Sequence, residues 1–232
     1  MRWIVISDLH GDLDALEWAL DEAGDVDLAL FAGDLTDFGD AVEARRMLAP
    51  FFERELALVA VSGNCDRDGV RGVLESAGVS IEGRSSAVRG FRFVGSGGGL
   101  RHHGMTPHEL TEDELEACIL AALNSADEAE GRRAEGAGLV VLSHTPPNGT
   151  TLDRRGPAHV GSHSLRMVLG ERRPALWVSG HIHEARSLSR LGASLLVNPG
   201  SLREGCYAIA EFEDSGEPRV ELRTKALRRS HG

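Results

Sequence analysis

The chain has 232 residues, of which 41% are hydrophobic and 26% charged, a composition typical of a soluble globular protein. Its 36 acidic and 25 basic residues give a net charge of −11 with histidines neutral, which argues against nucleic-acid binding because phosphate backbones would be repelled. No apolar run approaches the roughly 20 residues of a membrane-spanning helix. The N-terminal apolar stretch stops at Asp8, too short for an export signal, and the three cysteines are widely spaced. We therefore expect a cytoplasmic protein with no disulfide framework and no membrane partner.

The first third of the chain predicts three strand–loop–helix units in succession. Such units favour a parallel sheet with helices packed on it. The expected strands cover residues 2–7, 28–32 and 56–62, and the expected helices cover 13–23, 41–54 and 71–77.

The rest of the chain predicts mainly strands, interrupted by a helix over 111–131 and a shorter one over 162–170. Closely spaced strands after Gly180 favour antiparallel hairpins, so we expect a second sheet packed on the first. No internal repeat or linker divides the chain, which predicts one domain over 1–232; whether it forms a homo-oligomer is left open. The expected strands are 87–94, 138–143, 175–180, 186–191, 193–197, 206–212 and 218–223.

Five of the expected strands lead directly into loops that carry Asp, Asn or His. In open α/β sheets, ligands bind beyond the carboxyl ends of the strands, so these loops are expected to converge on one place. Each motif alone has an ordinary explanation, such as a loop cap or a hydrogen-bonded core histidine, but all five together do not. The motifs are Asp8-Leu9-His10, Gly33-Asp34, Gly63-Asn64-Cys65-Asp66, Ser143-His144 and Gly180-His181-Ile182-His183.

The spacing within two of these motifs favours a metal site. In extended backbone, residues two apart point to the same side, so Asp8 and His10 are expected to face one ligand together. His181 and His183 repeat the pattern, and their separation suits two metal ions about 3.5–4 Å apart. The glycines before three of the motifs allow a close approach of the backbone.

Taken in order, these motifs resemble those of the calcineurin-like metallophosphoesterase superfamily over residues 8–183. His144-Thr145-Pro146-Pro147, Gly161-Ser162 and Asn198-Pro199-Gly200-Ser201 are similar to a small prokaryotic branch related to the cyclic-AMP phosphodiesterase Icc. The resemblance implies a four-layer α/β/β/α sandwich of two mixed β-sheets flanked by helices.

The resemblance also implies a binuclear metal site. It assigns one metal ion to Asp8, His10, Asp34 and His183, and the other to Asp34, Asn64, His144 and His181, with Asp34 bridging. Oxygen and nitrogen ligands without thiolate suit Mn, Fe, Zn, Co or Ni, and we expect manganese.

With those metals, the implied activity is hydrolysis of a phosphodiester or a small phosphomonoester by a hydroxide that bridges the two ions. Cyclic nucleotides are compatible with the resemblance, but no residue selects them. The alternative is a non-catalytic protein-binding scaffold on the same fold, which would be free to lose metal ligands. A DNA-repair nuclease of the superfamily fits less well, because the chain is acidic and lacks the histidine of the Gly-Asn-His-Asp motif.

Cys65 stands where many relatives have that histidine, which helps to protonate the leaving group. A thiol is a weak hydrogen-bond partner and a poor acid near neutral pH, so the source of this proton is open. A nucleophilic role for Cys65 is not expected, because the Cys-x5-Arg phosphate loop is missing. His102 is a candidate acid, and His103 and His159 are candidate substrate contacts. The pairs Arg154-Arg155 and Arg172-Arg173 are more simply explained as solvated surface.

Overall fold

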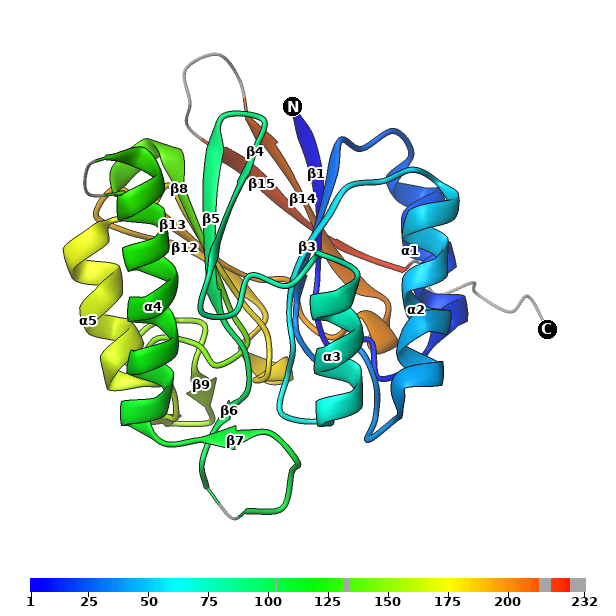
Figure 1. Cartoon of the computed structure of the whole chain (residues 1–232), viewed down its shortest axis with the longest axis horizontal. Coiled ribbons are helices and arrows are strands. Elements are labelled where there is room, and N and C mark those ends of the chain that lie inside the picture. Colours follow the sequence, from blue (N-terminus) through cyan, green and yellow to red (C-terminus); the bar gives the residue numbers. More distant parts are fainter. Residues whose placement is uncertain (103, 132–133, 213–217, 226–232) are drawn as a thin grey trace.

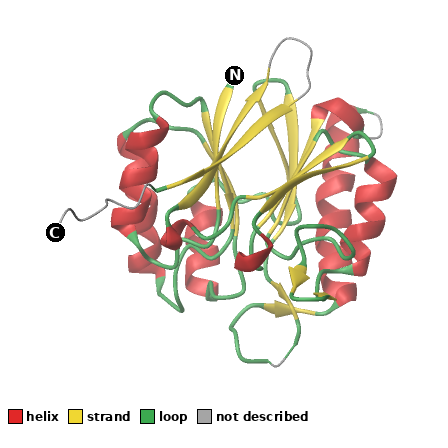
Figure 2. Cartoon of the chain, turned by 180° about the vertical axis from the view of Figure 1, so that it is seen from behind, coloured by secondary structure: helices red, strands yellow, loops and turns green. Residues whose placement is uncertain are grey.

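Two large β-sheets lie face to face in the computed structural model, which describes residues 1–102, 104–131, 134–212 and 218–225. Helices cover the outer face of each sheet, as Figure 1 and Figure 2 show from opposite sides. Both sheets contain parallel and antiparallel pairs. The four-layer α/β/β/α sandwich of mixed sheets expected from the sequence is confirmed.

The first sheet has five strands in the order β15-β14-β1-β2-β3. Strands β1, β2 and β3 are parallel, as predicted, and β14 and β15 add an antiparallel hairpin beside β1. The elements of this half are β1 (Arg2–Ile6), α1 (Leu13–Ala23), β2 (Leu28–Ala32), α2 (Ala41–Glu53), β3 (Leu58–Val61), α3 (Asp68–Ser76), β14 (Cys206–Phe212) and β15 (Pro218–Thr224).

The second sheet has six strands in the order β12-β13-β11-β8-β5-β4. Its four central strands are parallel and its two edge strands are antiparallel to their neighbours. The elements are β4 (Ser85–Val88), β5 (Phe91–Ser96), α4 (Glu112–Glu130), β8 (Leu139–Ser143), α5 (His163–Arg172), β11 (Leu176–Ser179), β12 (Ser187–Leu191) and β13 (Ser194–Asn198).

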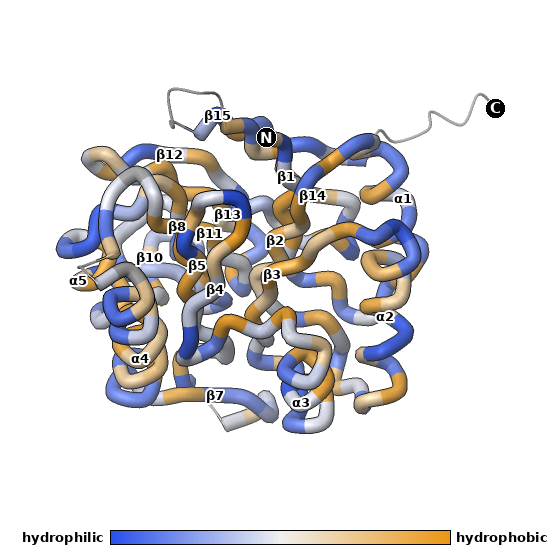
Figure 3. Tube along the Cα trace, turned by 45° about the horizontal axis from the view of Figure 1, so that its top comes forward, coloured by the Kyte–Doolittle hydropathy of each residue, from blue (hydrophilic) through white to orange (hydrophobic). Residues whose placement is uncertain are grey.

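Alternation along the strands builds three hydrophobic layers. In β1, Ile4 and Ile6 pack with the helices α1, α2 and α3, whereas Trp3 and Val5 pack between the two sheets. In β11, Trp177 instead faces α4 and α5. Figure 3 shows β2 and β3 coloured largely hydrophobic, in keeping with strands that are buried on both faces. This double burial fixes the register of the central strands, and with it the position of the loops that follow them.

Two details of the strand assignment were wrong. The expected strand 87–94 is a hairpin of β4 and β5, turned at Arg89 and Gly90, which both have positive φ (51° and 86°). Such a two-residue turn favours Asn-Gly, so Arg-Gly gave little signal. The hairpins after Gly180 also do not share one sheet: β12 and β13 join the second sheet, whereas β14 and β15 join the first.

Two short ladders lie at the edge where the parallel strands end. One pairs β6 (Gly99–Leu100) with β7 (Glu109–Leu110), and the other pairs β9 (Arg154–Arg155) with β10 (Ala158–His159). The Glu109 carboxylate accepts backbone N–H bonds from His102, Gly104, Met105 and Thr106. Burial would raise the pKa of Glu109, but the donors at Thr106 and Gly104 outweigh it and lower the pKa to about 2. One carboxylate thus gathers four described backbone N–H groups of the segment between β6 and β7.

Candidate metal centre

The loops after β1, β2, β3, β8 and β11 bring the seven predicted ligand side chains to one edge of the sandwich. The loop after β1 is tied to the loop after β2 by backbone bonds: Asp8 N donates to Gly33 O (2.9 Å), and His10 N donates to Asp34 O (3.0 Å). Asn198 and Ser201 add further ties, because Asn198 Nδ2 donates to Ile182 O (2.9 Å) and Ser201 Oγ donates to Asp8 O (3.0 Å). The edge is therefore held together independently of any ligand.

Asp8, His10 and His183 form the first group of donor atoms, which all lie within 4.8 Å of one another. His183 Nε2 lies 3.2 Å from Asp8 Oδ1, and the rings of His10 and His183 are 5.6 Å apart. His10 Nε2 also lies 3.8 Å from Asp34 Oδ2. These residues match the set that the sequence assigned to one metal ion.

Asp34, Asn64 and His144 form the second group. His144 Nε2 lies 2.9 Å from Asn64 Oδ1 and 3.4 Å from Asp34 Oδ2. His181 contacts this group through its ring, 5.0 Å from the His144 ring, and its backbone N–H donates to the Asp8 carboxylate. Asp34 thus lies between the two groups.

The hydrogen bonds of His144 leave a place for a cation. His144 Nδ1 lies 2.8 Å from Ala32 O, and this carbonyl can only accept, so Nδ1 carries the proton. The lone pair of Nε2 then faces the oxygens of Asn64 and Asp34, an arrangement that is favourable only with a proton or a metal ion between these atoms. The donor set of carboxylates, an amide oxygen and imidazoles therefore fits divalent transition metals.

Backbone strain marks the same residues. Asp8, His10, Asp34 and His181 have φ of 55°, 50°, 57° and 68°, in the left-handed region that non-glycine residues seldom adopt. The prediction that Asp8 and His10 share one side of an extended segment was therefore wrong, and His183 begins a 3-10 turn rather than continuing a strand. Strain of this kind costs about 1–3 kcal/mol per residue and clusters at functional sites.

Two glycines are required by close packing around the carboxylates. A Cβ at Gly63 would overlap the carboxylate of Asp34, and one at Gly180 would overlap Ser7 Oγ and lie 2.6 Å from Asp8 Oδ2. Both positions are thus closed to any larger residue, as the sequence led us to expect.

The carboxylates and imidazoles of the metal-free centre shift one another's pKa values. Burial raises the pKa of Asp34, but the neighbouring His144 and His10 outweigh it and hold that pKa well below its usual range. Burial lowers the pKa of His144, but the Asp34 carboxylate outweighs it and raises the pKa to about 9. Burial and the nearby His144 lower the pKa of His181 to about 4. In the metal-free centre, His144 therefore favours its protonated form beside Asp34, and the hydrogen bond to Asp8 likewise raises the pKa of His183.

The raised pKa of His144 makes the stability of the metal-free protein depend on pH. The folded protein binds this proton more tightly than the unfolded chain, so the stabilisation is present below pH 6.5 and is lost as the pH rises through about 9. We expect the free energy of unfolding, measured with urea in the presence of a chelator, to fall by about 2 kcal/mol between pH 7 and 9. Equal stability at the two pH values would contradict the assigned proton.

Cys65 and Asp66 support the Asp34 carboxylate and its loop from the loop after β3. The backbone N–H of Cys65 donates to Asp34 Oδ1 (2.8 Å). Asp66 is fully buried and accepts bonds from the backbone N–H groups of Leu35, Thr36 and Gly63 and from the Thr36 hydroxyl. Burial and the Asp34 charge nevertheless raise the pKa of Asp66 to about 7. Asp66 therefore joins the loop after β3 to the loop after β2.

The Cys65 side chain is not activated. Burial, and then the nearby Asp34 carboxylate, raise the pKa of the Cys65 thiol far above its ordinary value. Its sulfur lies within 4.8 Å of donor atoms of His10 and Asp34, so it stands at the centre as a neutral thiol. The neutral form fits the expectation that Cys65 is not a nucleophile.

Of the three other histidines predicted for the site, two lie in the described part of the chain and one does not. His102 and His159 line a cleft that also reaches His181, whereas His103 lies outside the described residues. His159 Nδ1 donates to the buried Asp153 (2.6 Å), a contact that the sequence did not indicate. Arg155 lines the same cleft, but Arg172 is buried and paired with Asp127 (2.8 Å), so the expectation of a solvated surface is wrong for Arg172.

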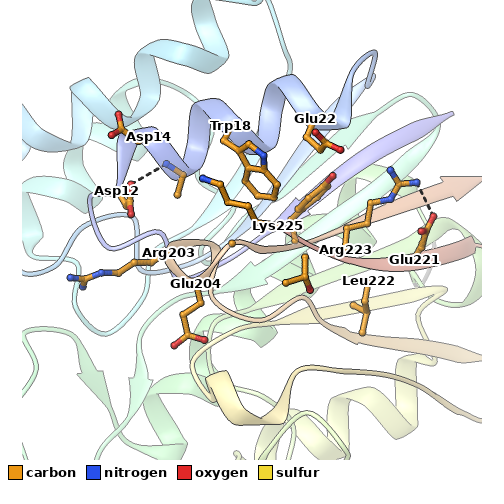
Figure 4. Close-up of a pocket in the computed structure, with 14 residues that line it drawn as sticks. Asp12, Asp14, Trp18, Glu22, Arg203, Glu204, Glu221, Leu222, Arg223 and Lys225 are labelled. Atoms are coloured by element: carbon orange, nitrogen blue, oxygen red, sulfur yellow. Dashed lines mark hydrogen bonds and ion pairs between the residues drawn. The ribbon is translucent and has the colours of Figure 1, made fainter. Parts of the chain in front are cut away.

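A pocket of about 1250 Å³ lies beside α1 and β15 and holds neither group of donors. Figure 4 shows Lys225 beside Trp18 in this pocket, and Lys225 Nζ lies 5.0 Å from the centre of the Trp18 ring. Glu204 belongs to its lining and lies 4.0 Å from His183, so this pocket adjoins the centre from outside. Its lining mixes both charge signs and offers no cluster of metal donors.

Comparisons with known proteins agree with this fold. A relative that is 30% identical over 205 residues, the uncharacterized protein MJ1162 of Methanocaldococcus jannaschii, aligns with 86% of this chain and 88% of its own length. The crystal structure of TT1561 of Thermus thermophilus matches with a TM-score of 0.69 and 21% identity, over 96% of this chain and 98% of the other. A dimetal phosphatase from Danio rerio matches with a TM-score of 0.58 and 13% identity, over 95% and 98%.

None of the described helices combines the length and apolar character needed to cross a membrane.

The profile of the calcineurin-like phosphoesterases matches residues 1–185, which include both groups of donor atoms. The chain therefore belongs to the calcineurin-like phosphoesterase family, a family of hydrolases that act on phosphoesters.

Proposed function

We propose that the protein is a binuclear metal-dependent phosphohydrolase that cleaves a phosphodiester or a small phosphomonoester. The observation that carries the proposal is the position of Asp34, whose Oδ2 faces His10 Nε2 at 3.8 Å and His144 Nε2 at 3.4 Å. A carboxylate between two groups of nitrogen and oxygen donors is suited to bridge two cations. The similarity to a dimetal phosphatase in fold is consistent with this use of the site.

Under this proposal, Asp8, His10, Asp34 and His183 hold one ion, and Asp34, Asn64, His144 and His181 hold the other. Two divalent ions, of which manganese is our choice, would lower the pKa of a shared water and neutralise phosphate charge. The chain's own contribution is to fix the ligands: Ala32 O orients His144 (2.8 Å), and the backbone N–H of Cys65 orients Asp34 (2.8 Å). Such supporting bonds set the tautomer and direction of each ligand.

The leaving group would occupy the cleft beside His181. His102 and His159 line that cleft and are the proposed proton donor and substrate contact. His159 has its tautomer fixed by Asp153 (2.6 Å), so its Nε2 is the nitrogen without a proton in the neutral ring. His102 is therefore the better of the two as an acid.

Replacement of Cys65 tests whether this residue reacts covalently. Because the thiol is held protonated, we expect Cys65→Ala to lower kcat/KM by less than about tenfold, whereas loss of a nucleophile costs about 10³-fold or more. The measurement is turnover of an aryl phosphoester by the purified manganese-loaded variant. A phosphorylated protein trapped from the unsubstituted chain and absent from the variant would contradict the proposal.

The activity itself is tested with bis(4-nitrophenyl) phosphate and 4-nitrophenyl phosphate, after metal analysis of the same sample. We expect two divalent ions per chain and turnover of at least one ester, lost on chelation and restored by manganese. Bound metals without turnover of either ester would favour the non-catalytic scaffold instead.

A further inference from the structure

The cleft beside His181 is lined by residues from several separate segments. Four of them are the loop after β6, the loop after β8, the hairpin of β9 and β10, and the start of α5, and the start of α4 and the loop after β11 complete the lining. Its volume is about 310 Å³, at the small end of the range for ligand pockets. Because His181 is one of the proposed metal ligands, a phosphoester at the metal centre would extend its leaving group into this space.

The charge of the lining is opposite to that of the chain as a whole. With histidines neutral, the chain carries 36 acidic against 25 basic residues, yet the cleft is lined by two arginines and by one carboxylate, Glu112. That carboxylate already accepts bonds from Ser162 Oγ (2.6 Å) and from the backbone N–H of His163 (2.9 Å). Burial would raise the pKa of Glu112, but these donors outweigh it and keep the group ionised as a cap of α5. The only carboxylate in the described lining is thus already engaged, which leaves the two guanidinium groups as the charged groups open to a ligand.

Arg101 and Arg155 supply the permanent charges. Arg101 NH2 lies 3.7 Å from Glu114 Oε2, and Arg155 Nε lies 3.7 Å from Glu184 Oε1. Both distances exceed a hydrogen bond, so neither guanidinium uses its planar pair of donors on its neighbour. That pair matches the geometry of a carboxylate or a phosphate.

The wall that carries Arg155 is firmly built. Asp153 is fully buried and accepts bonds from His159 Nδ1 (2.6 Å) and from the backbone N–H groups of Gly149 (3.0 Å) and Gly161 (3.1 Å). This one carboxylate joins both strands of the hairpin to the loop after β8. These bonds fix the backbone that carries Arg155, whose side chain is 67% exposed and reaches the cleft from this wall.

We propose that this cleft binds a second anionic group, a carboxylate or a phosphate, on the leaving group of the substrate. The preferred substrate is then a small phosphoester that carries a further negative charge beyond the ester being cleaved. The inference rests on the proposed function for the position of the ester and adds the class of leaving group. An uncharged leaving group would leave both guanidinium groups without a bidentate acceptor in the complex.

The test compares three aryl phosphates of similar shape on the manganese-loaded full chain. They are 3-carboxyphenyl phosphate, 1,3-phenylene bisphosphate and 3-carbamoylphenyl phosphate. The leaving groups of the first two carry a second anion, and the leaving group of the third carries an uncharged amide. We expect kcat/KM for at least one anionic ester to exceed that of the amide by about tenfold, the size of one charge-assisted bond. The anionic ester whose kcat/KM exceeds that of the amide by the larger factor shows whether the cleft prefers a carboxylate or a phosphate.

The ratio is then measured in Arg101→Gln/Arg155→Gln. We expect it to fall to within about twofold of one, because the donors for the second anion are gone. Arg166→Gln is the control for loss of a nearby positive charge: it removes one such charge from α5, outside the cleft lining, and is expected to keep the ratio. A ratio near one in the unsubstituted protein, or an unchanged ratio in the double variant, overturns the inference and leaves the phosphoesterase intact.

Equilibrium binding gives a readout that needs no turnover. The phosphonate analogues of the carboxylate and the amide are titrated into the same three proteins. We expect about tenfold tighter binding of the carboxylate, lost in the double variant. If no ester is hydrolysed, the proposed function fails, and the phosphonate ratio alone decides whether the cleft selects a second anion.

Discussion

Replacing Asp34 with alanine is expected to remove both metal ions and to lower kcat/KM for an aryl phosphoester by about 10³-fold or more. The carboxylate lies between His10 and His144, so its loss takes a ligand from both groups at once. The substitution also leaves the backbone N–H of Cys65 without its acceptor, Asp34 Oδ1. The measurements are metal content after gel filtration and kcat/KM at saturating manganese.

Asp37→Ala is the matched control for this substitution. Asp37 follows the same strand but pairs with Arg203 (3.4 Å) at the surface, with about half of its side chain exposed. We expect it to retain two metal ions and turnover within about twofold, because an exposed pair contributes little. An Asp34→Ala protein that kept both ions and full turnover would refute the bridging role.

Replacing Asp66 with alanine is expected to lower the free energy of unfolding by about 3–5 kcal/mol. The side chain is fully buried and accepts four hydrogen bonds, three of them from backbone N–H groups of Leu35, Thr36 and Gly63. Without it, those donors lie buried with no acceptor. Urea unfolding of the metal-free proteins at pH 8 measures the difference.

Asp68→Ala serves as the control, since Asp68 lies two positions further on and its side chain is 94% exposed. We expect a change below about 1 kcal/mol there. Asp66→Asn is expected to be intermediate, because its amide keeps one acceptor oxygen but places an N–H₂ group against backbone donors. Equal stability of Asp66→Ala and Asp68→Ala would show that the buried carboxylate does not hold the two loops.

Much of the fold follows from the pattern of a few segments. Strands such as β2 and β8 are continuous apolar runs because both of their faces are buried, and such runs are readable from sequence. The motifs that follow them are informative because parallel strands must end at a common edge. The family could therefore be predicted from the motifs in the sequence, and the position of the candidate centre from the common edge of the strands.

What the sequence did not reveal depends on local backbone geometry and on distant partners. The left-handed conformation of Asp34 is held by bonds between loops that are far apart in the chain, and the modest preference of Asp for this region is too weak to predict it. The division of the last hairpins between the sheets is set by which edge remains open. The contact of His159 with Asp153 depends on the turn of a two-residue ladder. Such features emerge only when the whole chain is folded.

Crystals grown with manganese, with diffraction measured at its absorption edge, would locate the ions directly. We expect two anomalous peaks about 3.5–4 Å apart with the Asp34 carboxylate in contact with both. One peak should lie beside His10 and His183, and the other beside His144 and Asn64. A single peak, or two peaks that Asp34 does not join, would contradict the assignment.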